Sequence, residues 1–180
     1  MKELRMLLSR SLLSCALSIA TSTCWACRVP LPEQLITPDV QVALATDAVL
    51  ARVVNIIPKY DKGGDVDYQF LVVQRLTGSD QELFSISGHA PGRSRETTFD
   101  KHQDEAFWRR GGGRVMNDVD CVIHPEFVLG KTYLVFRNLP MTRRSFEEID
   151  TANGHSPDDD QWFAYIQAYV RQNRSNPPRL

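Results

Sequence analysis

Two neighbouring β-patterned segments constrain the fold of this chain more than any other feature. The first, residues 47–57, has apolar side chains in both alternating sets of positions, and Pro58 ends it. Residues 60–65 are turn formers that include two glycines, and a second β-rich segment, Val66–Leu76, follows them. Turn chemistry between two such segments predicts a β-hairpin.

Further strand patterns lie on either side of a polar insertion. We predict strands at Glu82–Ser87, at Cys121–Ile123 and at Lys131–Arg137, with Gly130 in the turn before the last one. Residues 88–118 are polar, charged and rich in glycine, and one stretch within them, Thr97–Arg109, has helical character. We therefore expect a long polar excursion on the domain surface.

The two ends of the domain carry different patterns. Residues 27–41 hold three prolines, which predict an extended or irregular entry segment. Near the other end, Ser156, Pro157 and Asp159 form a helix start, and apolar residues then recur at helical spacing. We expect a C-terminal helix at about Pro157–Gln172 that packs on the sheet, followed by a flexible tail, residues 173–180.

These patterns predict a mainly β fold, a small antiparallel barrel with helical decoration, as a single domain over residues 27–172. The net charge of the 180 residues is -1, so no basic excess exists to neutralise a phosphate backbone, and nucleic acid is not an expected partner. No segment approaches the ~20 apolar residues that a membrane-spanning helix needs. A membrane span is therefore not expected.

The N-terminus has the pattern of a secretory signal peptide. Three basic residues precede the apolar run Leu12–Ala20, and small residues follow it. Cleavage after Ala20 would leave three cysteines, whereas cleavage after Ala26 would leave two, Cys27 and Cys121. Because an oxidising compartment favours paired cysteines, we expect residues 1–26 to be removed on export to the periplasm or the extracellular space.

Several short segments, in their order and spacing, resemble one known family. They are Cys27–Pro30, Thr46–Val53, Val73–Gly78, and Cys121 with Phe127 and Gly130–Phe136. This layout is similar to the TIMP-like or netrin-module superfamily. The resemblance implies an OB-fold-like barrel over about residues 27–136 and a disulfide between Cys27 and Cys121, which would stabilise the fold by several kcal/mol in the chain-entropy model.

The resemblance also implies a mode of binding. In TIMP-like inhibitors the α-amino group and the carbonyl of the first cysteine chelate the catalytic zinc of a metalloprotease, and an unprotonated amine is a suitable ligand. The binding residues would then be Cys27, Arg28, Val29 and Pro30, with the Arg28 side chain beside the zinc. The alternative is that Cys27 is only a structural half-cystine.

A second candidate binding segment lies in the excursion. Phe107 and Trp108 are followed by Arg109, Arg110 and Arg114 around three glycines. In one interpretation the two aromatic residues anchor the loop in the barrel mouth, and in the other the segment binds an acidic partner.

Candidate metal ligands lack a tight spacing. They are His89, Asp100, His102, Asp104 and Glu105 in the excursion, His124 after Cys121, and Asp61, Asp65 and Asp67 around the hairpin turn. The sequence contains neither a His-Glu-x-x-His motif nor a Gly-x-Ser-x-Gly motif. We expect no cofactor, no metal and no enzymatic activity; the alternative is a metal-dependent enzyme that uses residues 89–105.

The sequence thus predicts an exported protein-binding module. Its sharper form is a metalloprotease inhibitor that acts through Cys27, with a zinc metalloprotease as the partner. Its alternative is an envelope or extracellular interaction protein without inhibitory activity.

Overall fold

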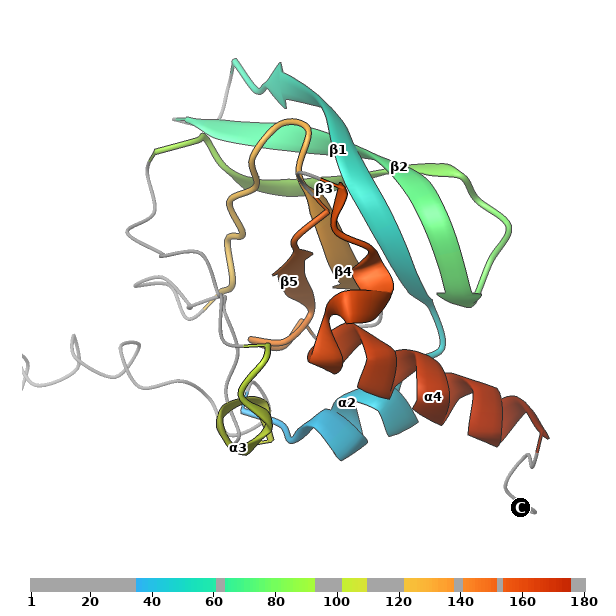
Figure 1. Ribbon diagram of the computed structural model, residues 1–180. Coiled ribbons are helices and arrows are strands. Elements are labelled where there is room, and N and C mark those ends of the chain that lie inside the picture. Colours follow the sequence, from blue (N-terminus) through green and yellow to red (C-terminus); the bar gives the residue numbers. More distant parts are fainter. Residues whose placement is uncertain are drawn as a thin grey trace, which may run out of the picture.

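The computed structural model describes residues 35–60, 64–92, 102–109, 122–137, 141–151 and 154–175. Five antiparallel strands form one curled sheet in the order β3-β2-β1-β4-β5 (Figure 1). The strands are β1 (Ala48–Pro58), β2 (Asp65–Thr77), β3 (Leu83–His89), β4 (Thr132–Phe136) and β5 (Phe146–Ile149). The helices are α2 (Pro38–Ala43), α3 (Glu105–Trp108), the 3₁₀ helix η4 (Pro157–Asp159) and α4 (Gln161–Ser175).

The predicted hairpin is confirmed as β1 and β2. Their antiparallel register runs from Ala48 opposite Thr77 to Pro58 opposite Val66, and it shifts at three places. Such β-bulges increase the local twist of a strand pair. The twist lets the long hairpin curl, so that the sheet becomes half of a barrel rather than a flat layer (Figure 1).

The middle of the sheet is buried on both faces. Val49 and Ala51 of β1 belong to the apolar cluster inside the barrel, whereas Ala48 and Leu50 belong to a second cluster on the opposite face. The helices α2 and α4 cover that second face (Figure 1). The two-sided apolar pattern of residues 47–57 is therefore explained by a core on each side, a barrel interior and a helical layer.

An extended segment, residues 122–128, lies between the two edge strands, β3 and β5, and closes the barrel there. We call it the closing segment. Ile123, Pro125 and Phe127 are buried in alternation. The Phe127 ring contacts four aromatic rings, including Phe146 of β5, at a centroid distance of 5.3 Å. The carbonyl of Pro125 accepts a hydrogen bond from the His89 amide of β3.

The predicted fold class is confirmed. The described structure is mainly β, and its five strands pair antiparallel. Their order is that of an OB-like barrel that is open between β3 and β5, and a C-terminal helix packs against the sheet. Within the described residues, no helix is both long enough and apolar enough to cross a membrane.

Several predicted boundaries are wrong. In the described part of the expected helix Thr97–Arg109, only α3 is helical, and His102 and Gln103 before it form a turn. The entry segment is not irregular throughout, since Thr37 caps α2 and Pro38 occupies its first turn. Of the expected strand Cys121–Ile123, only Ile123 forms a bridge among its described residues.

The C-terminal helix begins as predicted but has two parts. Ser156 and Asp159 form a capping box around the 3₁₀ helix η4. Asp160 then adopts an extended conformation, and α4 runs to Ser175, beyond the expected end at Gln172. The strand β5 was not predicted from the sequence.

Replacing Gly88 with alanine should destabilise the protein through the closing segment. A β-carbon at Gly88 would overlap the carbonyl oxygen of Pro125. We expect the free energy of unfolding in urea to fall by about 3 kcal/mol, at the upper end of ordinary overpacking costs. The control Gly154→Ala has open space around the new β-carbon and should cost about 1 kcal/mol through its positive φ alone. Equal costs for the two variants would contradict this close packing.

Candidate functional site

A group of charged side chains is buried where β5 meets the start of α4; we call His102, Arg144, Glu147 and Asp160 the ionic cluster. Nδ1 of His102 lies 2.6 Å from Oδ2 of Asp160, and its Nε2 lies 3.5 Å from Oε2 of Glu147. Nη1 of Arg144 lies 3.3 Å from the other oxygen of Glu147. Two cations thus balance two carboxylates.

The surroundings shift the pKa values of the two cations in opposite directions. Burial by itself lowers the pKa of His102, but hydrogen bonds to Asp160 and Glu147 and their negative charges outweigh burial and raise this pKa to about 9. For Arg144 burial dominates, and its pKa falls below the usual value although Glu147 offsets part of the effect. His102 is therefore protonated at neutral pH.

Aromatic rings and a backbone carbonyl complete the surroundings of Arg144. Its guanidinium lies 4.9 Å from the centroid of the Trp162 ring and donates a hydrogen bond to the carbonyl of Trp108. The rings of Trp108 and Trp162 are 5.4 Å apart, and both are buried. A desolvated cation over a tryptophan face is strongly favourable. The ionic cluster therefore fixes α3 to α4.

A histidine between two carboxylates has the groups that general acid–base catalysis requires. Here, however, the side chain of His102 is 5% exposed and that of Glu147 is 0% exposed, so a substrate has no access to either. Asp160 also accepts a hydrogen bond from the Phe163 amide at 2.8 Å, which caps α4. The geometry of the ionic cluster supports a structural role.

The two described residues of the candidate segment Trp108–Arg114 lie apart, one in the core and one at the surface. Trp108 is 2% exposed and packs in the helical layer rather than in the barrel mouth. Arg109 stays at the surface, where it pairs with Glu105 at 2.6 Å and lies about equally close to the Trp108 and Tyr165 rings. Arg110, Arg114 and the Phe107 side chain lie outside the described residues.

Tyr165 joins the two helices of this layer. Its hydroxyl donates a hydrogen bond to Asp39 of α2. Burial, together with this hydrogen bond and the charge of Asp39, raises the pKa of Tyr165 to about 12. Tyr165 therefore stays a neutral donor throughout the physiological range.

The candidate residues at the expected mature N-terminus, Cys27, Arg28, Val29 and Pro30, lie outside the described part of the chain, as does Cys121. The disulfide and the zinc-chelating terminus therefore remain predictions.

The candidate metal ligands lie in separate groups, one of which contains the stacked rings of His89 and His124. His89 lies beside Asp65 and His102 belongs to the ionic cluster, while Asp67 pairs with Lys59 at 2.6 Å. Asp61 and Asp100 lie outside the described residues. Among the described histidines, cysteines and acids, no group of three or more is placed to hold a metal ion.

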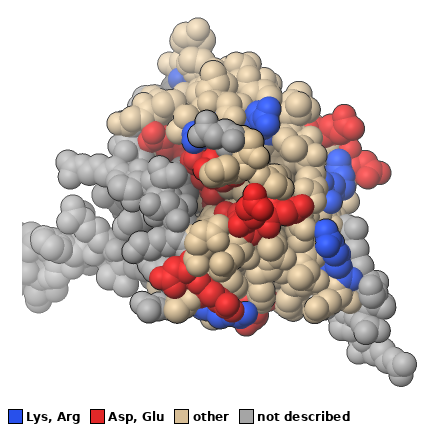
Figure 2. Space-filling view, viewed as in Figure 1, with Lys and Arg blue, Asp and Glu red and all other residues tan. Residues whose placement is uncertain are grey.

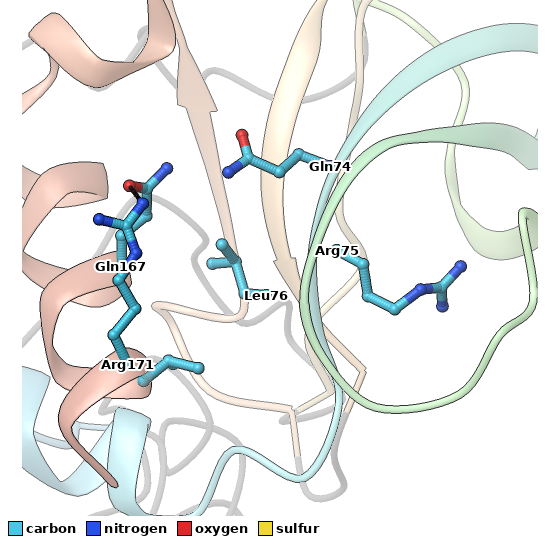
Figure 3. Close-up of a pocket in the computed structure, with 6 residues that line it drawn as sticks. Gln74, Arg75, Leu76, Gln167 and Arg171 are labelled. Carbon is cyan, nitrogen blue, oxygen red and sulfur yellow. Dashed lines mark hydrogen bonds between the residues drawn. The ribbon is translucent and has the colours of Figure 1, made fainter. Parts of the chain in front are cut away.

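A groove of about 220 Å³ lies between the end of β2 and the C-terminal half of α4. Figure 3 shows Gln74 and Leu76 directed toward α4, whereas Arg75 points away on the other side of the strand. Gln167 accepts a hydrogen bond from Arg171 and donates one to Asp158. The groove therefore has a mixed lining without a concentration of charge.

An exposed apolar surface lies on the part of the sheet that the helical layer does not cover. Leu71 pairs directly with Leu83 of β3, and Ile57 lies on β1 with its side chain on the same side. Val54 and Val73 occupy β-bulges of the same strands. We call these five residues, each 41–52% exposed, the outer sheet face. The register places Arg52 beside Leu71 and the exposed Asn55–Gln69 pair between Leu71 and Ile57, so polar side chains lie among these apolar ones. Exposed apolar side chains on neighbouring strands are a feature of interaction surfaces.

Sequence reasoning missed the outer sheet face. Its signal was present in the alternation of β1 and β2, but a two-sided apolar strand pattern does not tell which face a helix covers.

Charge is mixed over the molecule where it can be seen. Figure 2 shows acidic and basic side chains interspersed on the viewed face, rather than one extended basic surface.

Comparison of the chain with known protein families and with curated proteins found no match. The TIMP-like resemblance therefore remains a prediction.

The stability of the protein should fall as the pH rises through about 9. The folded-state pKa of His102, about 9, lies above the 6.5 of the unfolded chain, so its contribution is complete below pH 6.5 and is lost as His102 deprotonates. Denaturation between neutral pH and about pH 10 should show a loss of about 3 kcal/mol.

The control is His102→Gln, which cannot change its charge. This variant should be less stable at neutral pH and should lack the decline that His102 causes. An identical pH profile in the two proteins would rule out His102 as its source.

Proposed function

We propose that this chain is an exported protein-binding module that contacts its partner through the outer sheet face. The observation that carries the proposal is the exposure of five apolar side chains on adjacent strands beside a helical layer. In OB-folds the face of strands 2 and 3 is a common ligand surface. Leu71 and Leu83 lie on these strands here.

The chemistry of the outer sheet face favours a protein partner. Binding of single-stranded nucleic acid relies on cations for the phosphates and on aromatic rings that stack with the bases. The outer sheet face consists instead of aliphatic side chains, with Arg52 directly opposite Leu71 and with Lys59 already paired to Asp67. Only about 57% of the area of a non-obligate protein–protein interface is apolar, so a surface with apolar and polar side chains side by side suits a protein partner.

Export and the absence of catalysis belong to the same proposal. Export rests on the N-terminal pattern and on the parity of Cys27 and Cys121. The metal-dependent alternative at residues 89–105 loses support because His89 and His102 have separate partners. A zinc metalloprotease, or another envelope or extracellular protein, is the proposed partner.

A sharper version of the proposal is metalloprotease inhibition through the Cys27 amine and carbonyl, with Arg28 beside the zinc. The OB-like strand order supports it, because TIMP-like inhibitors are built on that fold. Its alternative is an envelope interaction role that uses the outer sheet face without inhibiting a protease.

Site-specific photo-crosslinking tests the role of the outer sheet face. A photoreactive side chain at position 83 should form a defined crosslink to an envelope or extracellular protein, and excess unlabelled chain should suppress it. The unlabelled variant Leu71→Glu should need at least a tenfold higher concentration to suppress the crosslink, because burying a carboxylate in an apolar interface costs more than about 1.4 kcal/mol.

The matched control is Leu44→Glu, because Leu44 is 60% exposed at the end of α2, in the helical layer rather than on the outer sheet face. It should compete as well as the unaltered chain. Equal competition by the two variants would contradict binding through the outer sheet face.

Extending the mature chain by one alanine before Cys27 tests the inhibitor version. Zinc chelation requires the Cys27 amine to be the terminal group, so the extended chain should lose inhibition of a panel of zinc metalloproteases that the mature chain inhibits. The mature chain without the extra alanine is the control. Inhibition by both forms, or by neither, would contradict chelation.

A further inference from the structure

The outer edge of β3 is an exposed strand edge. β3 stands at one end of the strand order, next to β2, and within the described residues no further strand pairs with it. The strand at the other end, β5, is buried along its whole length, whereas Leu83, Ser85 and Ser87 of β3 are exposed. Because an open strand edge is a template for pairing with another chain, the edge of β3 is a candidate interaction surface.

The register shows which backbone groups of β3 face this edge. In an antiparallel pair, alternate residues direct both of their backbone groups at the partner strand. The Val72 amide donates to the Glu82 carbonyl, and at the other end of the same ladder the Ala90 amide donates to the Gly64 carbonyl. The even-numbered residues of β3 therefore face β2, and the odd-numbered residues face outward. The outward residues are Leu83, Ser85, Ser87 and His89.

The closing segment limits the free part of the edge. The amide of His89 donates to the Pro125 carbonyl at 3.1 Å, in agreement with the outward direction of the odd-numbered residues. In the described part of the chain, the backbone groups of Leu83, Ser85 and Ser87 make no such bond to another segment. Each of the three offers one N–H and one C=O group. An extended polypeptide has donors and acceptors at the same spacing.

This edge lacks the features that keep strand edges from pairing. Proteins block such edges with proline, charged side chains, bulges or very short strands. Residues 83–87 contain no proline and no charged residue, and β3 keeps one register with β2 over its 7 residues. The Lys59 ammonium donates to the Ser87 hydroxyl, but Asp67 balances its charge on the face of the sheet. The edge is therefore suited to pairing.

We propose that the protein partner adds an extended segment of its own to the outer edge of β3 as a further antiparallel strand. The inference rests on the proposed function, because Leu83 belongs both to this edge and to the outer sheet face. Backbone hydrogen bonds hold the segment in register, while the rest of the partner covers Leu71 and Leu83. A second copy of this chain suits the edge less well, because antiparallel pairing of two β3 strands leaves both outer sheet faces uncovered on the same side.

The exposed side chains of β3 define the sequence of the added segment. In an antiparallel pair, directly opposed residues place their side chains on the same face, where they contact each other. Leu83 favours an apolar residue opposite it, whereas Ser85 and Ser87 favour small polar residues. Because the added strand runs antiparallel to β3, the segment carries its polar residues first and its apolar residue last.

A synthetic peptide with this pattern tests strand addition to the full chain. It has threonine opposite Ser87 and Ser85 and valine opposite Leu83, and its intervening residues are N-methylated so that it does not pair with itself. Amide hydrogen exchange of the chain is followed by nuclear magnetic resonance. At about ten times its Kd, the peptide should slow exchange of the outward amides of residues 83, 85 and 87 about tenfold, by mass action. The amides of Phe84 and Ile86 already face β2 and should not change.

The matched control peptide has its N-methyl groups on the residues that face β3, which removes the donors of the pairing. It should bind at least tenfold more weakly, because each lost backbone hydrogen bond reduces the affinity several-fold. Equal binding of the two peptides, or binding of neither, would overturn strand addition. Protection of the same amides when the concentration of the chain alone is raised would identify a second copy as the occupant and would also overturn it.

Replacing Ser85 with proline tests the same edge with the natural partner. Proline lacks the outward N–H but is tolerated on an edge strand, whereas the control Ser85→Ala keeps this N–H. In competition for the position-83 crosslink, Ser85→Pro should be at least tenfold weaker than Ser85→Ala, because it loses a hydrogen bond and its ring obstructs the added strand. Equal competition by these two variants, with Leu71→Glu still impaired, would overturn strand addition and leave the proposed function intact. Peptide binding together with unimpaired competition by Leu71→Glu would contradict the proposed function alone.

Discussion

Glu147 is fully buried, and two cations from different parts of the chain balance its charge. Removing a carboxylate from water costs several kcal/mol unless partners of opposite charge and hydrogen bonds replace the solvent. His102 arrives from the excursion, and Arg144 from the loop that precedes β5. The burial of β5, the position of α3 and the docking of α4 are therefore mutually dependent. The helices cover the other half of the sheet and leave the outer sheet face exposed.

The elements that sequence reasoning identified correctly are those with one strong local pattern. The hairpin, β4 and α4 are of this kind, and the two-sided pattern of β1 even reflected its burial between two apolar clusters. The strand β5 was missed because its central residues, Glu147 and Glu148, indicate a solvated segment by composition. Both are buried only because cations reach them from elsewhere, with Lys131 lying 3.0 Å from Glu148. No local pattern contains that information.

The candidate site shows the same limit. Arg109 and Arg144 each stack on a tryptophan and pair with a glutamate, yet the first is at the surface and the second is 1% exposed. The sequence around Trp108 gave two interpretations, and burial supports its role as an anchor. The alternation of β1 and β2 contained the apolar residues of the outer sheet face, but not their exposure, because that depends on which part of the sheet the helices cover. The helix α2 could have been predicted, because Thr37 and Pro38 are typical residues of a helix start. The three prolines of residues 27–41 instead led to the prediction of an extended or irregular segment.

Asp160 makes two structural contacts with its two oxygens: one accepts a hydrogen bond from the Phe163 amide in the first turn of α4, and the other accepts one from Nδ1 of His102. The helix therefore cannot fray at its start without loosening residues 102–109, and these residues cannot leave without weakening the helix start. Residues that are chemically similar to aspartate can perform only one of these two roles. Asparagine or serine can cap a helix, but neither can neutralise a charged imidazole. Because of these two contacts, position 160 tolerates fewer substitutions than its partial exposure suggests.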